Sequence, residues 1–163
     1  MGIKERSVDD RPIFKDVSED VTFNFIASYN KFSDEMTIIL KGHLFVEYML
    51  DMLIQKKISK PQIILKYTFS RKLDILYSLN LIPDYLYKNI TCLNLCRNKL
   101  AHNLNYKLSK DELTIHVDNN KNVNLKTLKK SSVKSSAGTF CYMILSQLNN
   151  HYIQNLKIVP IFP

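Results

Sequence analysis

The sequence predicts a mainly α-helical fold: an up-and-down bundle of four to five helices, with a small β-hairpin inserted after the fourth helix. Apolar residues recur at three- and four-residue intervals over most of the chain, which is the helical period. Only 3 Gly and 5 Pro occur among 163 residues, which argues against a turn-rich all-β fold. The helical period gives way to alternation over residues 112–117, which predicts a strand there.

The length predicts one domain. We expect a flexible N-terminal arm over residues 1–16, a single helical domain over 17–157 and a short tail over 158–163. Arg11-Pro12 discourages a helix in the arm. The arm lacks the apolar core of a signal peptide, and the chain has no run of ~18 apolar residues. We therefore expect a cytoplasmic protein that makes no membrane contact.

The first expected helix has Ser18 as its candidate cap and ends at about Tyr29. The second runs from Asp34 to about Lys57 and is capped by Ser33. The second is the most apolar segment of the chain. Its one consistent polar row has four-residue spacing and comprises His43, Glu47, Asp51 and Gln55. Three interpretations are open for this row: a solvent-facing stripe, a set of metal ligands, or a carboxylate partner for an arginine. A metal is the least favoured, because no second ligand cluster occurs elsewhere.

Chain breaks and candidate helix caps predict the remaining helices and strands. Ser59-Lys60-Pro61 interrupts the chain, and residues 62–66 predict a brief helix or turn. A third helix is expected at about 71–80 after a cap at Ser70, and a fourth from Asp84 to about His102. Residues 106–108 and 112–117 then predict a hairpin or two short strands, and a last helix spans about 132–155.

The fourth helix carries an arginine on its apolar stripe. At 3.6 residues per turn, five apolar side chains fall within about 60° of Arg97: Leu86, Ile90, Leu93, Leu100 and Leu104. Asn94 and Asn98 lie on one flank, and His102 lies about 140° round. A guanidinium buried on such a stripe needs a carboxylate, a phosphate, carbonyl groups or a second chain, and Glu47 is the candidate carboxylate. The alternative is a packed stem whose charged head reaches water.

Three cysteines are an odd number, and their spacing matches no disulfide framework. Cys92 and Cys96 are four residues apart on the fourth helix, and Cys141 lies on the last. We expect buried free thiols in a reducing compartment.

The segment Arg97-Asn98-Lys99-Leu100-Ala101-His102 matches the Arg-Asn-x-x-Ala-His form of the Arg-x(4–6)-His motif. It resembles the motif of the HEPN superfamily, small helical proteins of which many are ribonucleases of toxin and phage-defence systems. Residues 42–47 and 68–83 are similar to the segments that precede the motif in the branch containing mannitol-operon-repressor-like proteins. The resemblance covers roughly residues 36–104.

The resemblance implies a homodimer whose two motif helices face each other and form one composite site. Arg97 and His102 would cleave RNA there without a metal or another cofactor. Histidine is suited to acid and base work near neutral pH, and arginine clamps a phosphate while staying charged. The supporting or substrate-binding residues that we expect are Asn94, Asn98, Glu47 and Lys99.

The net charge of +8 and the pI of about 9.3 favour a polyanionic partner, nucleic acid before membrane. Two functions are therefore consistent with the sequence. The first is a metal-independent endoribonuclease of a toxin–antitoxin or phage-defence system, with an antitoxin or regulatory protein as a further partner. The second is a non-catalytic regulatory module that binds nucleic acid or a partner protein. In the nucleotidyltransferase-paired toxins of the superfamily a Tyr lies two residues after the motif His. Leu104 stands there in this chain, which argues against regulation by modification of that tyrosine.

Overall fold

The computed structural model describes residues 21–29, 31–103, 105–117, 121–124 and 131–158. The expected N-terminal arm, the expected cap of the first helix at Ser18 and the tail beyond Ile158 lie outside these residues.

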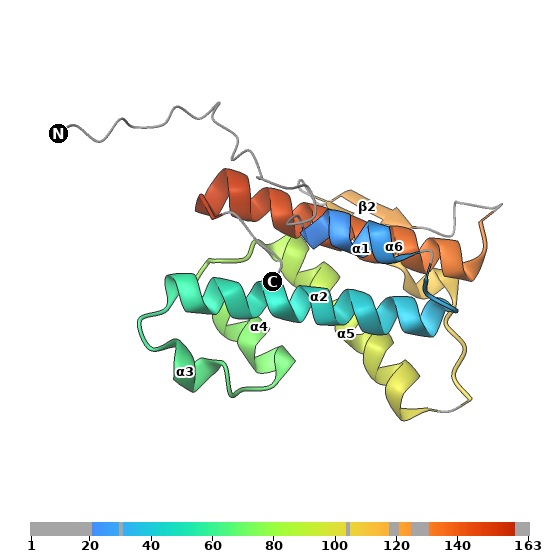
Figure 1. The fold of residues 1–163 in the computed structure, drawn as a ribbon, viewed down its shortest axis with the longest axis horizontal. Coiled ribbons are helices and arrows are strands. Elements are labelled where there is room, and N and C mark those ends of the chain that lie inside the picture. Colours follow the sequence, from blue (N-terminus) through green and yellow to red (C-terminus); the bar gives the residue numbers. More distant parts are fainter. Residues whose placement is uncertain (1–20, 30, 104, 118–120, 125–130, 159–163) are drawn as a thin grey trace.

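The fold is a bundle of α-helices with one small hairpin, as the sequence predicts (Figure 1). The α-helices are α1 (Val21–Tyr29), α2 (Glu35–Lys57), α3 (Pro61–Ile64), α4 (Phe69–Ser78), α5 (Asp84–His102) and α6 (Val133–His151). Between α5 and α6 lie a 3-10 turn, η2 (Lys110–Glu112), and the antiparallel strands β1 (Thr114–Val117) and β2 (Lys121–Asn124). A π-helical turn, η5 (Tyr152–Leu156), extends α6. No helix in the described part of the chain is long and apolar enough to cross a bilayer.

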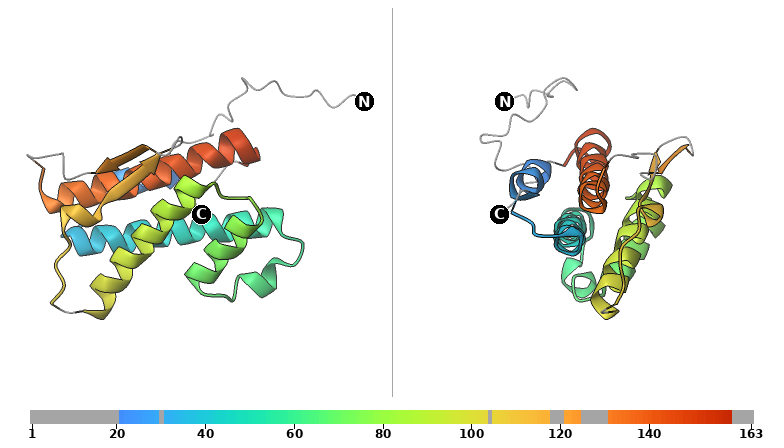
Figure 2. Two further views of the ribbon diagram at one scale, coloured as in Figure 1. Left: turned by 180° about the vertical axis from the view of Figure 1, so that it is seen from behind. Right: turned by 90° about the vertical axis from the view of Figure 1, so that its right-hand side faces the viewer.

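Helix α2 is the central element of the bundle. It packs against α1 and α6 on one side and against α4 and α5 on the other, as the end-on view in Figure 2 shows. The helix begins one residue later than predicted, because the carboxylate of Asp34 and not the hydroxyl of Ser33 is the cap. The Asp34 carboxylate accepts a hydrogen bond from the backbone N–H of Thr37 at 2.7 Å, which lowers the pKa of Asp34. The buried residues of α2 are Ile38, Ile39, Gly42, His43, Val46, Met49, Leu50, Leu53 and Ile54.

Two glycines allow the helices around α6 to approach closely. A Cβ at Gly42 would lie 2.5 Å from the sulfur of Cys141, so α2 and α6 pack with no room for a side chain there. A Cβ at Gly138 would overlap the ring of Tyr29, which seats α1 on α6. Packing therefore requires glycine at Gly42, where a Cβ would also meet the Cβ of Cys141, whereas a Cβ at Gly138 would displace only the outer end of the Tyr29 ring.

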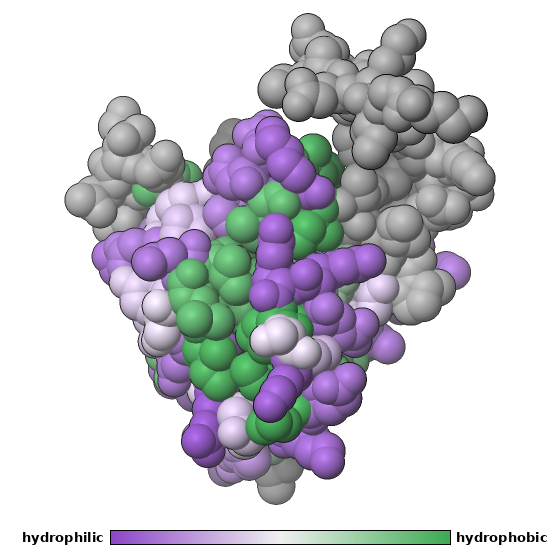
Figure 3. Space-filling view, turned by 90° about the vertical axis from the view of Figure 1, so that its left-hand side faces the viewer, coloured by the Kyte–Doolittle hydropathy of each residue, from purple (hydrophilic) through white to green (hydrophobic). Residues whose placement is uncertain are grey.

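The third helix differs in its start from the prediction. Helix α4 begins at Phe69 with Thr68 as its cap, so Ser70 lies inside the first turn, and no cap hydrogen bond holds the Thr68 side chain. Pro61 opens the brief helix α3, which fits proline at a first helical position. Figure 3 shows apolar surface at the end of the bundle that α3 helps to form. Ile63 of α3 and Leu79, which follows α4, are both exposed.

The hairpin uses different strands from those predicted. Strand β1 pairs with β2, with Ile115 opposite Val123, while residues 106–108 form no strand. Residues 110–112 turn helically because Ser109 and Glu112 form a reciprocal capping box. Burial confirms the alternation up to His116, with Ile115 buried and Thr114 and His116 half-buried, but Val117, predicted to face the core, is also only half-buried.

Candidate functional site

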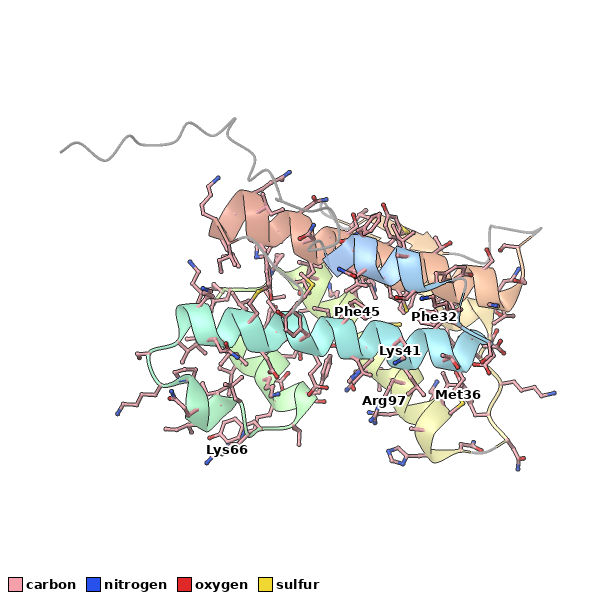
Figure 4. The ribbon with its side chains drawn as sticks, viewed as in Figure 1. Phe32, Met36, Lys41, Phe45, Lys66 and Arg97 are labelled. Carbon is pink, nitrogen blue, oxygen red and sulfur yellow. The ribbon has the colours of Figure 1, made fainter. Side chains whose placement is uncertain are left out.

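The apolar stripe around Arg97 is confirmed for the described residues. Leu86, Ile90, Leu93 and Leu100 are all buried, and Leu104 lies outside the described part of the chain. Arg97 is half-buried at the edge of this stripe. Figure 4 shows its side chain projecting from α5 just below the N-terminal half of α2. The stem of Arg97 is packed, and its head is near the surface.

Arg97 has an amide partner and no carboxylate. Its Nη1 donates to the side-chain oxygen of Asn98 at 3.0 Å. No carboxylate in the described residues lies within 4.0 Å of the guanidinium. A neutral acceptor leaves the positive charge of Arg97 uncompensated, so the remaining N–H groups can bind an anion.

The predicted pairing of Glu47 with Arg97 is not formed. Glu47 and Asp51 instead flank the ammonium of Lys72 from α4, with N–O distances of 3.6 and 2.7 Å. The side chain of Lys72 is only 5% exposed, and a buried ammonium requires such compensation. His43, at the start of the row, has a different partner. The row is thus divided between two neighbours, and no group of metal-ligating side chains gathers in the described residues.

His43 joins Asn94 beside Arg97. Its Nε2 lies 3.1 Å from the side-chain oxygen of Asn94, whose Nδ2 donates to the hydroxyl of Ser70 at 3.0 Å. Because the amide of Asn94 donates to Ser70, its oxygen accepts from His43, which places the ring proton on Nε2. The ring of His43 also lies against that of Phe69, with centroids 4.0 Å apart. Two predicted elements are therefore tied together at the point where Arg97 emerges.

Burial holds His43 in its neutral form. Loss of hydration lowers the pKa of His43, and the hydrogen bond to Asn94 opposes that shift only in part. The charge of Glu47 also raises this pKa, while that of Arg97 lowers it. The sequence placed His43 in a polar row of α2 but did not predict its contact with α5. The four-residue spacing of the row indicated that its members share one face of α2, but spacing does not show which helix packs against that face.

His102 is exposed at the last residue of α5, and no described residue holds its ring by a hydrogen bond. His102 lies five positions after Arg97, so the two side chains leave the helix about 140° apart. One chain therefore does not bring Arg97 and His102 into a shared pocket.

Lys99 lies on a different flank of α5 and is paired. Its ammonium binds the carboxylate of Glu112 at 2.7 Å, which raises the pKa of Lys99. Tyr106 donates to the other oxygen of the same carboxylate. These contacts fasten the segment that follows the motif onto α5 and leave Lys99 engaged with Glu112.

Comparison with known proteins gives no match: no family model, curated protein or solved structure is significantly similar to this chain.

Proposed function

We propose that the protein is a cytoplasmic, metal-independent endoribonuclease of the kind found in toxin–antitoxin and phage-defence systems, and that Arg97 and His102 act on the RNA. The observation that carries this proposal is the state of Arg97. It is half-buried in an apolar stripe, and its only hydrogen-bond partner among the described residues is the neutral amide of Asn98. By contrast, the buried cation Lys72 has two carboxylates. An RNA phosphate would supply the missing negative charge.

The chemistry needs one group to take the proton of the 2′-hydroxyl, another to protonate the leaving oxygen, and positive charge at the phosphate. Histidine fits both proton transfers near neutral pH, but each chain offers one motif histidine. A homodimer supplies the second His102 and a second Arg97. The neutral Asn94–His43 pair then holds the surface beside Arg97 in place.

The surface near Arg97 suits a second copy of the chain. Met36 and Leu44 lie on α2 with 42% and 55% of their surface exposed, and Figure 4 places Met36 on the same side of α2 as Arg97. The cores of specific interfaces are apolar, and methionine and arginine are enriched in them. Two Arg97 side chains brought together across it would repel until an anion lies between them.

The test is RNA cleavage in the presence of EDTA by the native protein, Arg97→Ala and His102→Ala. We expect cleavage by the native protein to persist with EDTA and to fall by about 10²–10⁴-fold in His102→Ala, the range for loss of an acid–base group. The matched control is His116→Ala, which removes a half-buried histidine of β1, and it should cleave normally. Equal cleavage by the native protein and both motif variants would contradict the proposal.

The second candidate is a non-catalytic regulatory module that binds nucleic acid or a partner protein. The observation that favours it is that no described residue orients the ring of His102, whereas acid–base catalysis needs a positioned ring. In that case the dimer would bind RNA without cutting it. Arg97→Ala would weaken binding, and His102→Ala would leave it unchanged.

A further inference from the structure

The chain is strongly basic from the end of α2 through α3 to the first turn of α4. No aspartate or glutamate occurs between Asp51 and Asp74, whereas five lysines and one arginine do. One of these cations, Lys72, is buried against two carboxylates. The other five are exposed and are called the basic turn here: Lys56, Lys57, Lys60, Lys66 and Arg71.

The carboxylates that flank the basic turn in the sequence are already engaged. Glu47 and Asp51 flank the buried ammonium of Lys72. Asp74 accepts a hydrogen bond from the hydroxyl of Tyr87 at 2.9 Å. Within the described residues, no carboxylate lies within 4.0 Å of the charged groups of the basic turn. The basic turn therefore presents uncompensated positive charge to the solution, and such a surface attracts a polyanion.

An aromatic ring positions the guanidinium of Arg71. The Cζ atom of Arg71 lies over the ring of Tyr67, 4.3 Å from its centroid. Tyr67 is half-buried, so the bundle holds its ring, whereas Arg71 is exposed. A ring face compensates a cation only weakly, so the N–H groups of Arg71 remain available to a phosphate. Lys66 directly precedes Tyr67 and adds a second exposed cation beside this pair.

Arg71 adjoins the candidate functional site. Ser70, the residue before Arg71, accepts a hydrogen bond from Nδ2 of Asn94 at 3.0 Å. Asn94 precedes Arg97 by three residues, which is nearly one turn of α5. Figure 4 shows Lys66 and Arg97 below α2, on the same side of that helix. A strand bound at Arg97 can therefore continue past Ser70 to Arg71.

We propose that Lys66, Tyr67 and Arg71 form a second subsite for single-stranded RNA, which holds nucleotides adjacent to those bound at Arg97. This inference rests on the proposed function, because one RNA strand occupies both places. Lys66 and Arg71 bind phosphates, and Tyr67 positions Arg71. A single strand is favoured over a duplex, since its unpaired bases are free to stack on aromatic rings and guanidinium groups.

The test is fluorescence anisotropy of a labelled 2′-O-methyl oligouridine of about 12 nucleotides, titrated with the full chain at several salt concentrations. The probe lacks the 2′-hydroxyl that cleavage needs, so binding is measured alone. Lys66→Ala and Arg71→Ala should each weaken binding about fivefold at about 0.1 M salt and reduce the salt slope by about 0.7, the loss of one phosphate contact. Arg71→Lys should keep the native slope, because it keeps the charge.

Tyr67 is tested by a matched pair of variants. Tyr67→Phe should bind as the native chain does, since the ring alone holds Arg71. Tyr67→Leu should weaken binding about two- to fivefold with an unchanged salt slope, because the cation stays but is no longer positioned. The control is Lys31→Ala, which removes an exposed cation before α2 and should leave both affinity and slope unchanged.

Native affinity and slope in both Lys66→Ala and Arg71→Ala would overturn the proposal. Binding of the native chain to phosphatidylserine vesicles but not to the oligonucleotide would overturn it as well. The cleavage assay with EDTA tests the proposed function separately. RNA that binds through this subsite but is never cut would contradict the nuclease and keep the subsite. Cleavage by the native protein, with normal binding by both variants, would contradict the subsite and keep the nuclease.

Discussion

Lys72 and Arg97 differ in how their positive charges are compensated. Lys72 is buried between the carboxylates of Glu47 and Asp51, so its charge is neutralised within the bundle. Arg97 is half-buried, and the Asn98 amide is its only acceptor among the residues that the structure describes. Because an uncompensated charge near the surface attracts an external anion, Arg97 is the cation of this pair that we associate with function.

His43 should make stability depend on pH. Its pKa in the folded protein lies below the ordinary value of 6.5, mainly because burial disfavours the charged ring. The unfolded chain therefore takes up the proton first as the pH falls through 6.5, and the free energy of unfolding falls with it until the folded pKa is reached. The contribution is fully present above 6.5.

We expect His43→Gln to flatten this decline, because its amide still donates to Asn94 but does not titrate. The measurement is denaturant unfolding at about pH 7.5, 6.5 and 5.5, above the range where carboxylates dominate. His102→Gln, at an exposed position, is the matched control and should keep the native decline. An identical slope in the native protein and His43→Gln would show that His43 is not the responsible group.

The sequence located the residues of the candidate site but not their partners. The helical wheel correctly put Arg97 on a stripe of buried leucines, because periodicity reports which face of a helix is buried. It did not show that Glu47 meets Lys72, since that depends on which helix packs against the face. The role of His43 was missed for the same reason.

At the scale of elements, the hairpin is fastened to the motif helix by one side chain. Asn89 of α5 is fully buried, accepts from the backbone N–H of His116 at 2.7 Å and donates to its C=O at 2.8 Å. Gln147 of α6 also donates to that C=O. One edge of β1 pairs with β2, and on the other edge the amide of Asn89 makes the backbone hydrogen bonds that a neighbouring strand would make.

We expect Asn89→Ala to destabilise the protein by about 1–3 kcal/mol, the cost of leaving buried polar groups unpaired. The loss should appear in thermal or denaturant unfolding and in faster hydrogen exchange of the His116 amide. Asn150→Ala, at an exposed position of α6, is the control and should change stability by no more than about 0.5 kcal/mol. If the two variants unfold alike, Asn89 does not hold the hairpin.

The elements themselves were largely predictable. The motif helix ends at His102 and the last helix is capped by Ser132, as their apolar periods and breakers indicate. The strand pairing was predicted wrongly, because residues 106–108 form no strand and β1 pairs instead with β2. The alternation over residues 112–117 located β1, but alternation does not identify the strand that pairs with it.

The whole molecule combines a closed core with exposed apolar surface on α2. The core runs on both sides of α2, while Met36 and Leu44 of the same helix are exposed. Exposed apolar patches rimmed by polar residues are a feature of interaction sites on soluble domains. The proposed dimer places this surface at its centre.

Leu44→Glu should therefore weaken dimerisation strongly without unfolding the chain, because it puts a charge into the proposed interface and changes no buried residue. Analytical ultracentrifugation over a concentration series measures the effect. Leu95→Glu, at an equally exposed position on α5, is the control and should leave the mass unchanged. A native protein that is monomeric at micromolar concentration would rule out the composite site.

The close packing of Gly42 against Cys141 can form only late in synthesis. The two residues are separated by almost one hundred positions, so α2 leaves the ribosome long before the helix that covers it. At about 5–20 residues per second, the wait is on the order of 5–20 s. During that time the apolar faces of the nascent α2 are uncovered on the α6 side. A chain that stops before α6 should be held by chaperones or degraded, and it should not accumulate as a folded fragment.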